Sequence, residues 1–182
     1  MWKERSRELV YQAKIFDLHK VERESADGRR GSFVLISSAD WVQVVALTKN
    51  DAGEECFVLV RQFRQGARKL TMELPGGLVD EDEKPEDAAR RELEEETGYV
   101  ADEFIKIGEV SPNPAIQDNI AHTFVALNAH LASDQSLDEH EIVDAELVPV
   151  SELDPERHPE FFVHAIMVTA MYWYEEWKAR RG

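Results

Sequence analysis

A single stretch of this 182-residue chain, residues 76–99, constrains its structure and chemistry more than any other. It begins with a glycine pair, which predicts a turn. Pro85 suits the first turn of a helix, where its missing N–H group is not needed. Gly98 suits the left-handed position that ends a helix. We therefore predict a helix that begins near Pro85 and ends at Gly98, with Asp82 or Glu83 capping its N-terminus.

One side of this predicted helix is acidic. About 3.6 residues per turn bring Glu92, Glu95 and Glu96 to the same side. Neighbouring carboxylates repel one another unless cations bind them, and oxygen ligands of this kind are preferred by Mg²⁺ and Mn²⁺. Most glutamate-rich helices, however, are simply solvated acidic faces. The spacing of these three residues alone leaves both interpretations open.

The whole segment resembles the Nudix box, a pattern with fixed gaps that is far more specific than three glutamates. The matching positions in this chain are Gly77, Glu83, Arg91, Glu92, Leu93, Glu95, Glu96 and Gly98. Tyr99 is a mild departure, since the last position of the box is usually aliphatic. The resemblance implies an α+β fold, the Nudix α/β/α sandwich with a mixed sheet. It also implies an enzyme that hydrolyses a diphosphate bond.

The resemblance implies roles for individual residues. The metal ligands are expected to be Glu92, Glu95 and Glu96, with the backbone carbonyl of Gly76, and the expected cofactor is Mg²⁺, with Mn²⁺ as a substitute. Arg91 is expected to orient these carboxylates and Glu83. The alternative for Arg91 is an exposed ion pair of little energetic value.

Segments outside the box resemble the ADP-ribose and nucleoside diphosphate sugar pyrophosphatases. Arg61-Gln62-Phe63-Arg64 and Glu73-Leu74-Pro75-Gly76-Gly77 precede and enter the box, and Pro114 follows it. Substrate contacts are therefore expected from Arg64, Glu73, Pro114 and Asn119, with His122 as a further candidate. For Arg64 the alternative is a surface arginine, for Asn119 a turn residue, and for His122 strand packing. This chain has Ser111-Pro112-Asn113 where the subfamily often has Ser-Pro-Gly, which leaves other sugars such as GDP-mannose open.

The general base in such enzymes often lies in a loop downstream of the box. Glu139 and Glu141 are the candidates here, in a run of acidic residues that is equally compatible with a solvated loop. If neither serves, Glu95 is expected to take that role. A carboxylate that removes the proton of the attacking water typically contributes a factor of order 10²–10⁴.

Composition limits the class of partner. The formal net charge is −16 and hydrophobic residues make up 43% of the chain, which favours a sizeable core and argues against binding nucleic acid or anionic membranes. The first residues are charged and no apolar run is long enough to cross a membrane, so a cytoplasmic protein is expected. Cys56 lies in an apolar run and is expected to be a buried thiol.

The pattern along the chain predicts an N-terminal strand element at residues 1–38 and a catalytic domain at residues 39–182, and the subfamily resemblance implies that the N-terminal element is used for dimerisation. Strands are expected at 8–24, 30–37, 41–48, 55–63, 104–110, 122–131 and 145–150. A short helix is expected from Ser151, and a last helix from Pro159 to Arg180. The subfamily resemblance implies a homodimer.

The expected activity is metal-dependent hydrolysis of nucleoside diphosphate sugars to a nucleoside monophosphate and a sugar phosphate. Other pyrophosphatases share the box and remain alternatives, with nucleoside triphosphates, dinucleoside polyphosphates or coenzyme A as substrates. A non-catalytic nucleotide-sugar sensor is a further alternative. Such a sensor has no need to retain a self-repelling cluster of glutamates.

Overall fold

The structure, a computed structural model, describes residues 1–137 and 142–181. The chain divides into two compact units. The first contains Met1–Asp40 and Ser111–Ile120, and the second contains Trp41–Val110 and Ala121–Gly182. Residues 111–120, which the sequence pattern assigned to the catalytic domain, thus group with the N-terminal strands.

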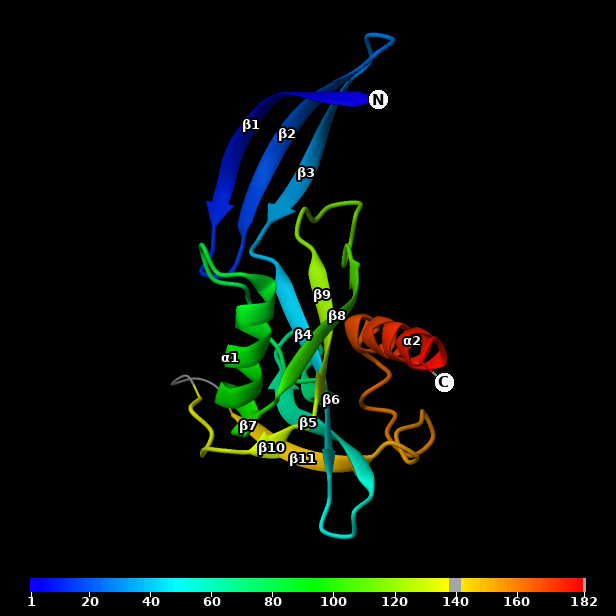
Figure 1. Ribbon diagram of the computed structural model, residues 1–182. Helices are drawn as coiled ribbons and strands as arrows, with labels where there is room; N and C mark the ends of the chain where they lie inside the picture. Colours follow the sequence, from blue (N-terminus) through cyan, green and yellow to red (C-terminus); the bar gives the residue numbers. More distant parts are fainter. Residues whose placement is uncertain (138–141, 182) are drawn as a thin grey trace. The chain divides into compact units, whose positions relative to one another are not determined.

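The first unit is built on a three-stranded antiparallel sheet in the order β1 (Trp2–Gln12), β2 (Asp17–Ser25), β3 (Arg30–Ser37) (Figure 1). The single strand expected over residues 8–24 is wrong, because the chain reverses between β1 and β2, where the N–H of Ala13 donates to the carbonyl of Phe16 at 2.9 Å. A turn at residues 26–28 connects β2 to β3, with Gly28 in a left-handed conformation at φ 84°. Glycine adopts that conformation without steric cost.

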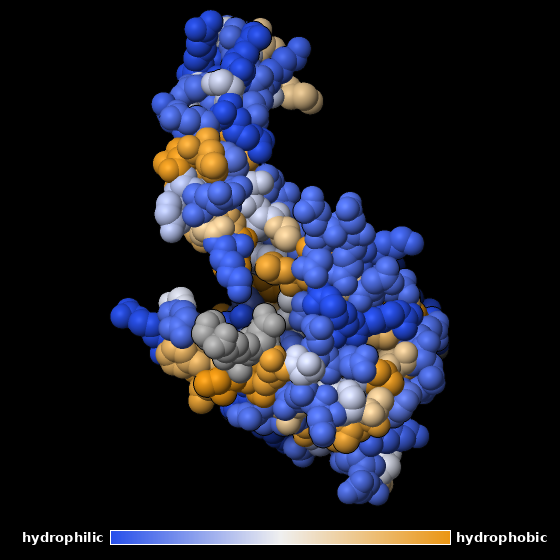
Figure 2. All heavy atoms as spheres, turned by 90° about the vertical axis from the view of Figure 1, so that its left-hand side faces the viewer, coloured by the Kyte–Doolittle hydropathy of each residue, from blue (hydrophilic) through white to orange (hydrophobic). Residues whose placement is uncertain are grey.

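The segment 111–120 is tied to the end of β3. The N–H of Ile36 donates to the carbonyl of Ile116 at 2.7 Å, and the Ser37 hydroxyl donates to the Asp118 carboxylate at 2.8 Å. Several apolar side chains of this unit remain at its surface, and Figure 2 shows apolar patches among its hydrophilic spheres. The exposed apolar residues of β1 to β3 are Trp2, Leu9, Val10, Tyr11, Phe33 and Val34.

The second unit contains a six-stranded mixed sheet in the order β11-β5-β4-β9-β8, with β6 paired to β5. Only the β4–β9 pair is parallel among these strand pairs of the described chain. The strands are β4 (Trp41–Lys49), β5 (Glu55–Arg64), β6 (Lys69–Glu73), β8 (Glu103–Val110), β9 (Ala121–Leu127) and β11 (Val143–Pro149). Two short strands, β7 (Tyr99–Val100) and β10 (His130–Leu131), pair with each other.

Two helices cover opposite faces of this sheet, α1 (Pro85–Thr97) and α2 (Ala165–Ala179) (Figure 1). Alternation along β4 serves both faces: Val44 packs in a cluster with Leu93 of α1, while Val45 packs in a cluster with Ala170 of α2. Successive side chains of a strand point to opposite sides, so one apolar strand supplies both cores. The predicted α+β sandwich with a mixed sheet is confirmed.

The connection before α2 differs from the expectation. Residues 151–164 form turns instead of a helix from Ser151, and α2 begins at Ala165 instead of Pro159. The Asp154 carboxylate accepts hydrogen bonds from the N–H groups of Glu156 and Arg157 at 2.8 and 2.9 Å, which fixes a turn there. In the described residues, neither helix is long and apolar enough to cross a membrane.

The strand expected over residues 122–131 is interrupted. Asn128 has a left-handed φ of 56°, so the chain leaves β9 at Leu127 and enters the short strand β10 at His130. Asparagine tolerates this conformation better than most residues. The break turns the chain from the large sheet toward β7, which follows α1.

Candidate active site on helix α1

Helix α1 is placed by its two ends. It begins at Pro85 after Lys84, and the expected side-chain cap from Asp82 or Glu83 is wrong. The Glu83 carboxylate instead accepts from the N–H of Asp80 at 3.0 Å and from Arg91. At the other end Gly98 is confirmed as the cap, with φ 73° and its N–H donating to the carbonyl of Glu94 at 2.7 Å.

The glycine turn before α1 runs along β4. The carbonyls of Pro75 and Gly77 accept from the N–H groups of Val44 and Val42, both at 2.9 Å. The N–H of Gly76 lies on the other side and donates to the Glu96 carboxylate at 2.9 Å. In extended backbone the N–H and C=O of one residue point the same way, so we expect the Gly76 carbonyl to face the carboxylates of α1 as well.

Both glycines are needed because of close approach. A Cβ atom on Gly76 would collide with the backbone carbonyl of Val42, and one on Gly77 would lie 2.6 Å from Cδ of Glu92. Real Cβ atoms essentially never come within 3.0 Å of another heavy atom in this way. The backbone turn thus forms a shallow cradle against the acidic side of α1.

Replacing Gly77 by alanine tests this cradle. The added methyl group must displace the Glu92 carboxylate, which is the end of a flexible side chain, so we expect a stability loss of about 1 kcal/mol. Hydrolytic activity should fall by at least about tenfold, because the displaced carboxylate no longer faces the turn. Gly66→Ala is the matched control, since a Cβ there has open space around it. Equal activity in the two variants would contradict this account of the cradle.

Arg91 connects the acidic groups around the cradle. It donates to Glu83 at 2.9 and 3.0 Å, to Glu92 at 2.8 Å and to Glu95 at 3.1 Å, and also to the carbonyl of Leu78 at 2.9 Å. The hydrogen bonds to Glu83 raise the pKa of Arg91, and those from Arg91 lower the pKa of Glu83. So many simultaneous partners support an orienting role better than an isolated surface pair.

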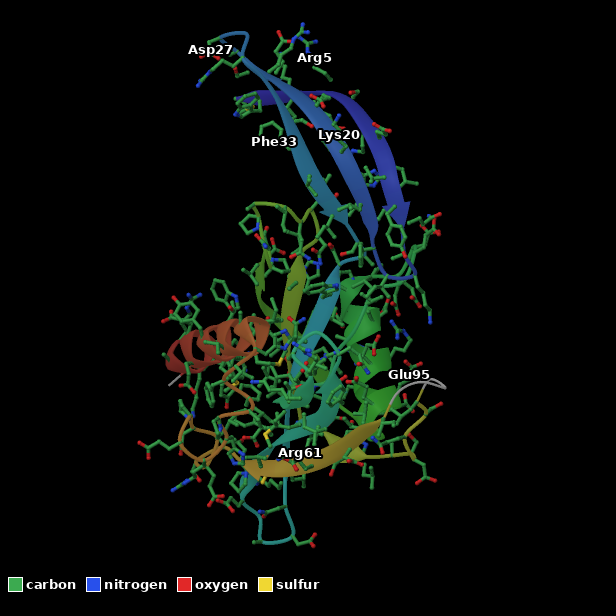
Figure 3. The ribbon with its side chains drawn as sticks, turned by 180° about the vertical axis from the view of Figure 1, so that it is seen from behind. Arg5, Lys20, Asp27, Phe33, Arg61 and Glu95 are labelled. Atoms are coloured by element: carbon green, nitrogen blue, oxygen red, sulfur yellow. The ribbon has the colours of Figure 1, made fainter. Side chains whose placement is uncertain are left out.

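The donor set fits a hard divalent cation. The carboxylates of Glu92, Glu95 and Glu96 and the carbonyl of Gly76 offer only oxygen atoms. The exposed fraction is 43% for the Glu95 side chain, 15% for the Glu92 side chain and 5% for Glu96. Glu95 projects from α1 in Figure 3. Across residues 1–137 and 142–181, no three His, Cys, Asp or Glu side chains converge closely enough to hold an ion by themselves. Glu92, Glu95 and Glu96 are among those residues, so the structure does not bring the three predicted ligands together as a metal-holding group by themselves. Mg²⁺ usually takes one or two carboxylates and fills its other positions with waters and substrate phosphates.

A second cluster surrounds Glu73 at the end of β6. Its side chain is 1% exposed and accepts a forked pair of hydrogen bonds from Arg64 at 2.8 and 2.6 Å. The Thr71 hydroxyl donates to the same carboxylate at 2.6 Å, and Nδ1 of His164 lies 3.3 Å from it. Burial alone would raise the pKa of Glu73, but Arg64, His164 and Thr71 outweigh it, so the pKa lies well below the ordinary glutamate value.

This lowered pKa makes stability depend on acidity. The Glu73 contribution is fully present above the unfolded glutamate pKa of about 4.3, and it is lost as the pH falls from there toward the folded-state pKa. We expect Glu73→Gln to cost about 2 kcal/mol at pH 7, and the difference from wild type to shrink as the pH falls below about 4. Urea unfolding at several pH values measures this difference in the free energy of unfolding. Glu94→Gln is the control, because Glu94 is exposed. A difference that stays constant with pH would contradict the assignment.

The other expected site residues belong to other elements than α1 and β6. Pro114 is exposed in a turn of the first unit, and Asn119 of that unit is 2% exposed, with no hydrogen-bond partner for its side-chain amide among the described residues. His122 on β9 is buried, with Nδ1 3.5 Å from Glu109. Glu139 and Glu141 fall outside the described residues.

Thr71 and His164 were not identified from the sequence. His164 lies ninety-one residues beyond Glu73, and no spacing pattern links them. The one available signal was Glu73 itself, a carboxylate between apolar residues at the end of a strand, which must find partners if it is buried. Met167 is a third case: its sulfur accepts from the N–H of Leu74 at 3.1 Å.

Comparison with known proteins gives consistent results. Residues 40–168 match the model of the NUDIX domain. An ADP-ribose pyrophosphatase of Bacillus subtilis is 33% identical over 140 residues, covering 76% of this chain and 74% of that protein. A methanol dehydrogenase activator of Bacillus methanolicus is 30% identical over 138 residues, covering 75% and 72%. A crystal structure of an ADP compounds hydrolase superposes with a TM-score of 0.82 at 24% identity, covering 100% of this chain and 96% of that one.

The family match covers well over half of the chain and includes the cradle, α1 and the start of α2. The similar crystal structure has the same fold over the full length of this chain. The glycine turn, the carboxylates of α1 and the mixed sheet agree with both findings. This chain is therefore a member of the Nudix hydrolase family.

Proposed function

We propose that this protein hydrolyses the diphosphate bond of nucleoside diphosphate sugars, ADP-ribose first among them, to a nucleoside monophosphate and a sugar phosphate. The observation that carries the proposal is the contact between the glycine cradle and the carboxylates of α1, with Gly76 donating to Glu96. The likeness to an ADP-ribose pyrophosphatase over three quarters of both chains supports the substrate class.

The box residues would hold the divalent cation. We assign Glu92, Glu95, Glu96 and the Gly76 carbonyl as its ligands, with Mg²⁺ as the expected ion and Mn²⁺ as a substitute. When bound, such a cation stabilises charge on phosphoryl oxygens and lowers the pKa of a water molecule. Arg91 fixes the rotamers of Glu92 and Glu95, so the carboxylates need little rearrangement when substrate binds.

Arg64 is the proposed contact to the diphosphate. The Arg64 side chain is 45% exposed, while the Glu73 carboxylate that holds its guanidinium is buried. A planar guanidinium matches phosphate oxygens in a forked geometry. Because Glu73 is 1% exposed, its contribution to substrate binding is to hold Arg64. Pro114 and Asn119 remain proposed contacts to the sugar or nucleoside.

A carboxylate must remove the proton of the attacking water. Glu139 and Glu141 are our candidates, and Glu95, the most exposed of the three box glutamates, is the alternative. Each of these three glutamates is replaced by glutamine in a separate variant, and the variant with the lowest kcat identifies the base. Near wild-type kcat for both Glu139→Gln and Glu141→Gln, with unchanged metal affinity, would leave Glu95 as the base.

A substrate panel tests the proposed function. ADP-ribose, GDP-mannose, other nucleoside diphosphate sugars, a nucleoside triphosphate, a dinucleoside polyphosphate and coenzyme A are incubated with Mg²⁺ or Mn²⁺. We expect the highest kcat/KM with a nucleoside diphosphate sugar and release of a nucleoside monophosphate. A higher kcat/KM with one of the other compounds would assign the protein a different Nudix activity. Binding of a nucleotide sugar without hydrolysis under any metal condition would make it a sensor.

We also propose that the protein is a homodimer and that the β1–β3 sheet supplies the contact. The rings of Trp2 and Phe33 pack edge to face with their centroids 5.3 Å apart, yet both residues remain more than 40% exposed. An exposed apolar face on a three-stranded sheet is a typical surface for association. Sedimentation equilibrium of the intact chain measures the mass. A monomer at micromolar concentration would contradict the proposal.

A further inference from the structure

The last turn of α1 is held by hydrogen bonds from outside the helix. A helix leaves its last carbonyls without partners of its own. Here the carbonyl of Glu95 accepts from the N–H of Ser136 at 2.9 Å, and the carbonyl of Glu96 accepts from Nε2 of the Gln135 side chain. Two neighbouring residues of the segment that follows β10 therefore satisfy the backbone of two neighbouring glutamates.

The same segment is anchored to the end of α1 and to the large sheet. The carbonyl of Gly98 accepts from the N–H groups of Ala132 and Ser133 at 2.9 and 3.2 Å. Nε2 of Gln135 also donates to the carbonyl of Val143 at 3.2 Å, in strand β11 at one edge of the sheet. An amide nitrogen of this kind carries two N–H groups, so Gln135 uses one on α1 and one on the sheet. Its side chain thus braces the last turn of α1 against β11.

These bonds act on two residues that carry proposed metal ligands. Glu96 is held at both ends, because its carboxylate accepts from the N–H of Gly76 at 2.9 Å while its carbonyl accepts from Gln135. Helix ends fray readily when their carbonyls lack partners. Groups that act together in a site must be held within about 0.5 Å of their working positions. Fraying of this turn would therefore displace the carboxylates of Glu95 and Glu96 together.

We infer that Gln135 is a positioning residue for the divalent cation: its side-chain amide fixes the last turn of α1, and with it the backbone from which Glu95 and Glu96 reach the ion. The inference rests on the proposed function, which assigns these carboxylates as ligands. Gln135 is exposed, whereas Glu96 and Val143 are buried. Replacing Gln135 therefore removes its two hydrogen bonds without opening a cavity in the core, and thermal unfolding should change little.

Charge and hydrogen bonding make opposite predictions at position 135. Gln135→Glu keeps the shape of the side chain but places carboxylate oxygens, which only accept, against two carbonyl oxygens. Gln135→Lys keeps N–H donors, and a cationic side chain is favourable near a helix C-terminus. If charge alone mattered, Gln135→Glu would bind a divalent cation more tightly and Gln135→Lys more weakly. Gln135→Met, of similar length, has neither a charge nor a donor.

Mn²⁺ binding to the substrate-free protein, followed by electron paramagnetic resonance, measures the effect. We expect the dissociation constant to rise about tenfold in Gln135→Glu and Gln135→Met, and to stay within about twofold of wild type in Gln135→Lys. The backbone N–H of Ser136, which donates to Glu95, should exchange with water at least about fivefold faster in the first two variants. Thr169→Val is the control and should change neither quantity, because its hydroxyl donates to a backbone carbonyl of the other helix, that of Ala165.

Unchanged Mn²⁺ affinity in Gln135→Met would overturn the inference. Tighter binding in Gln135→Glu together with weaker binding in Gln135→Lys would also overturn it, since charge alone would then explain the effect. Hydrolysis of a nucleotide sugar by wild type alongside either result leaves the proposed function intact. Failure of wild type on every substrate overturns the proposed function instead, and the Mn²⁺ affinities and exchange rates of the substrate-free protein still decide the role of Gln135.

Discussion

Glu96→Gln is expected to lower kcat by about a thousandfold while leaving the fold intact. The Glu96 side chain is 5% exposed and its carboxylate accepts from the N–H of Gly76, so it lies where α1 meets the cradle. Glutamine has the same shape and its carbonyl oxygen can still accept that hydrogen bond. What it lacks is the negative charge that a divalent cation needs. A bound cation contributes several kcal/mol to the transition state, and about 4 kcal/mol corresponds to a thousandfold change in rate.

Glu94→Gln is the matched control for this variant. Glu94 is exposed on the other side of α1. Its backbone carbonyl accepts from the N–H of Gly98, and this bond does not involve its side chain. Thermal unfolding should be unchanged in both variants, and Mn²⁺ binding, followed by electron paramagnetic resonance, should weaken only in Glu96→Gln. Retention of full activity in Glu96→Gln would remove this carboxylate from the proposed metal site.

Arg91→Ala is expected to lower activity by about a hundredfold through loss of orientation. Its five hydrogen bonds hold Glu83, Glu92 and Glu95 and reach the backbone at Leu78. Without the guanidinium, three neighbouring carboxylates lose their common partner and repel one another. Outer partners of metal ligands are typically worth 10–100-fold in affinity or activity. We expect a stability loss of about 2 kcal/mol, which is moderate because Arg91 is 29% exposed.

Two further variants define this effect. Arg90→Ala removes the neighbouring arginine, whose Cζ lies 4.2 Å from the centroid of the Phe104 ring and which pairs with Glu86. Because these contacts are remote from the carboxylates that Arg91 holds, we expect a slight loss of stability and little change in activity. Arg91→Lys keeps the charge but cannot reproduce the fork onto Glu83, and we expect an intermediate rate. Equal activity in Arg91→Ala and Arg90→Ala would mean that Arg91 is a surface ion pair without an orienting role.

The sequence was most informative where local rules and the box coincide. Pro85 and Gly98 set the limits of α1, and both hold in the structure because helix ends depend on backbone conformation that these residues favour locally. The sandwich itself was predicted from the resemblance to the Nudix box, and in the structure β4 contributes side chains to both of its cores. The predicted cap from Glu83 was wrong because its carboxylate accepts from Arg91, eight residues away, instead of from the N–H groups of the helix N-terminus.

The remaining features depend on contacts between distant parts of the chain. The buried Glu73 carboxylate accepts hydrogen bonds from Arg64 of the neighbouring strand β5 and from Thr71, and the turns before α2 bring Nδ1 of His164 to 3.3 Å from it. The hairpin that divides residues 8–24 was missed because polar residues on an exposed sheet carry little periodic signal. The helix expected at Ser151 failed because the Asp154 turn competes with it locally.

The decisive measurement is hydrolysis of ADP-ribose with and without added Mg²⁺, with products separated by chromatography and identified by mass. We expect equimolar AMP and ribose 5-phosphate in the presence of Mg²⁺, no reaction after chelation of divalent ions, and a loss of about a thousandfold in Glu96→Gln. Cleavage at full rate in chelator, or release of ribose and ADP instead of AMP and ribose 5-phosphate, would contradict the proposed function.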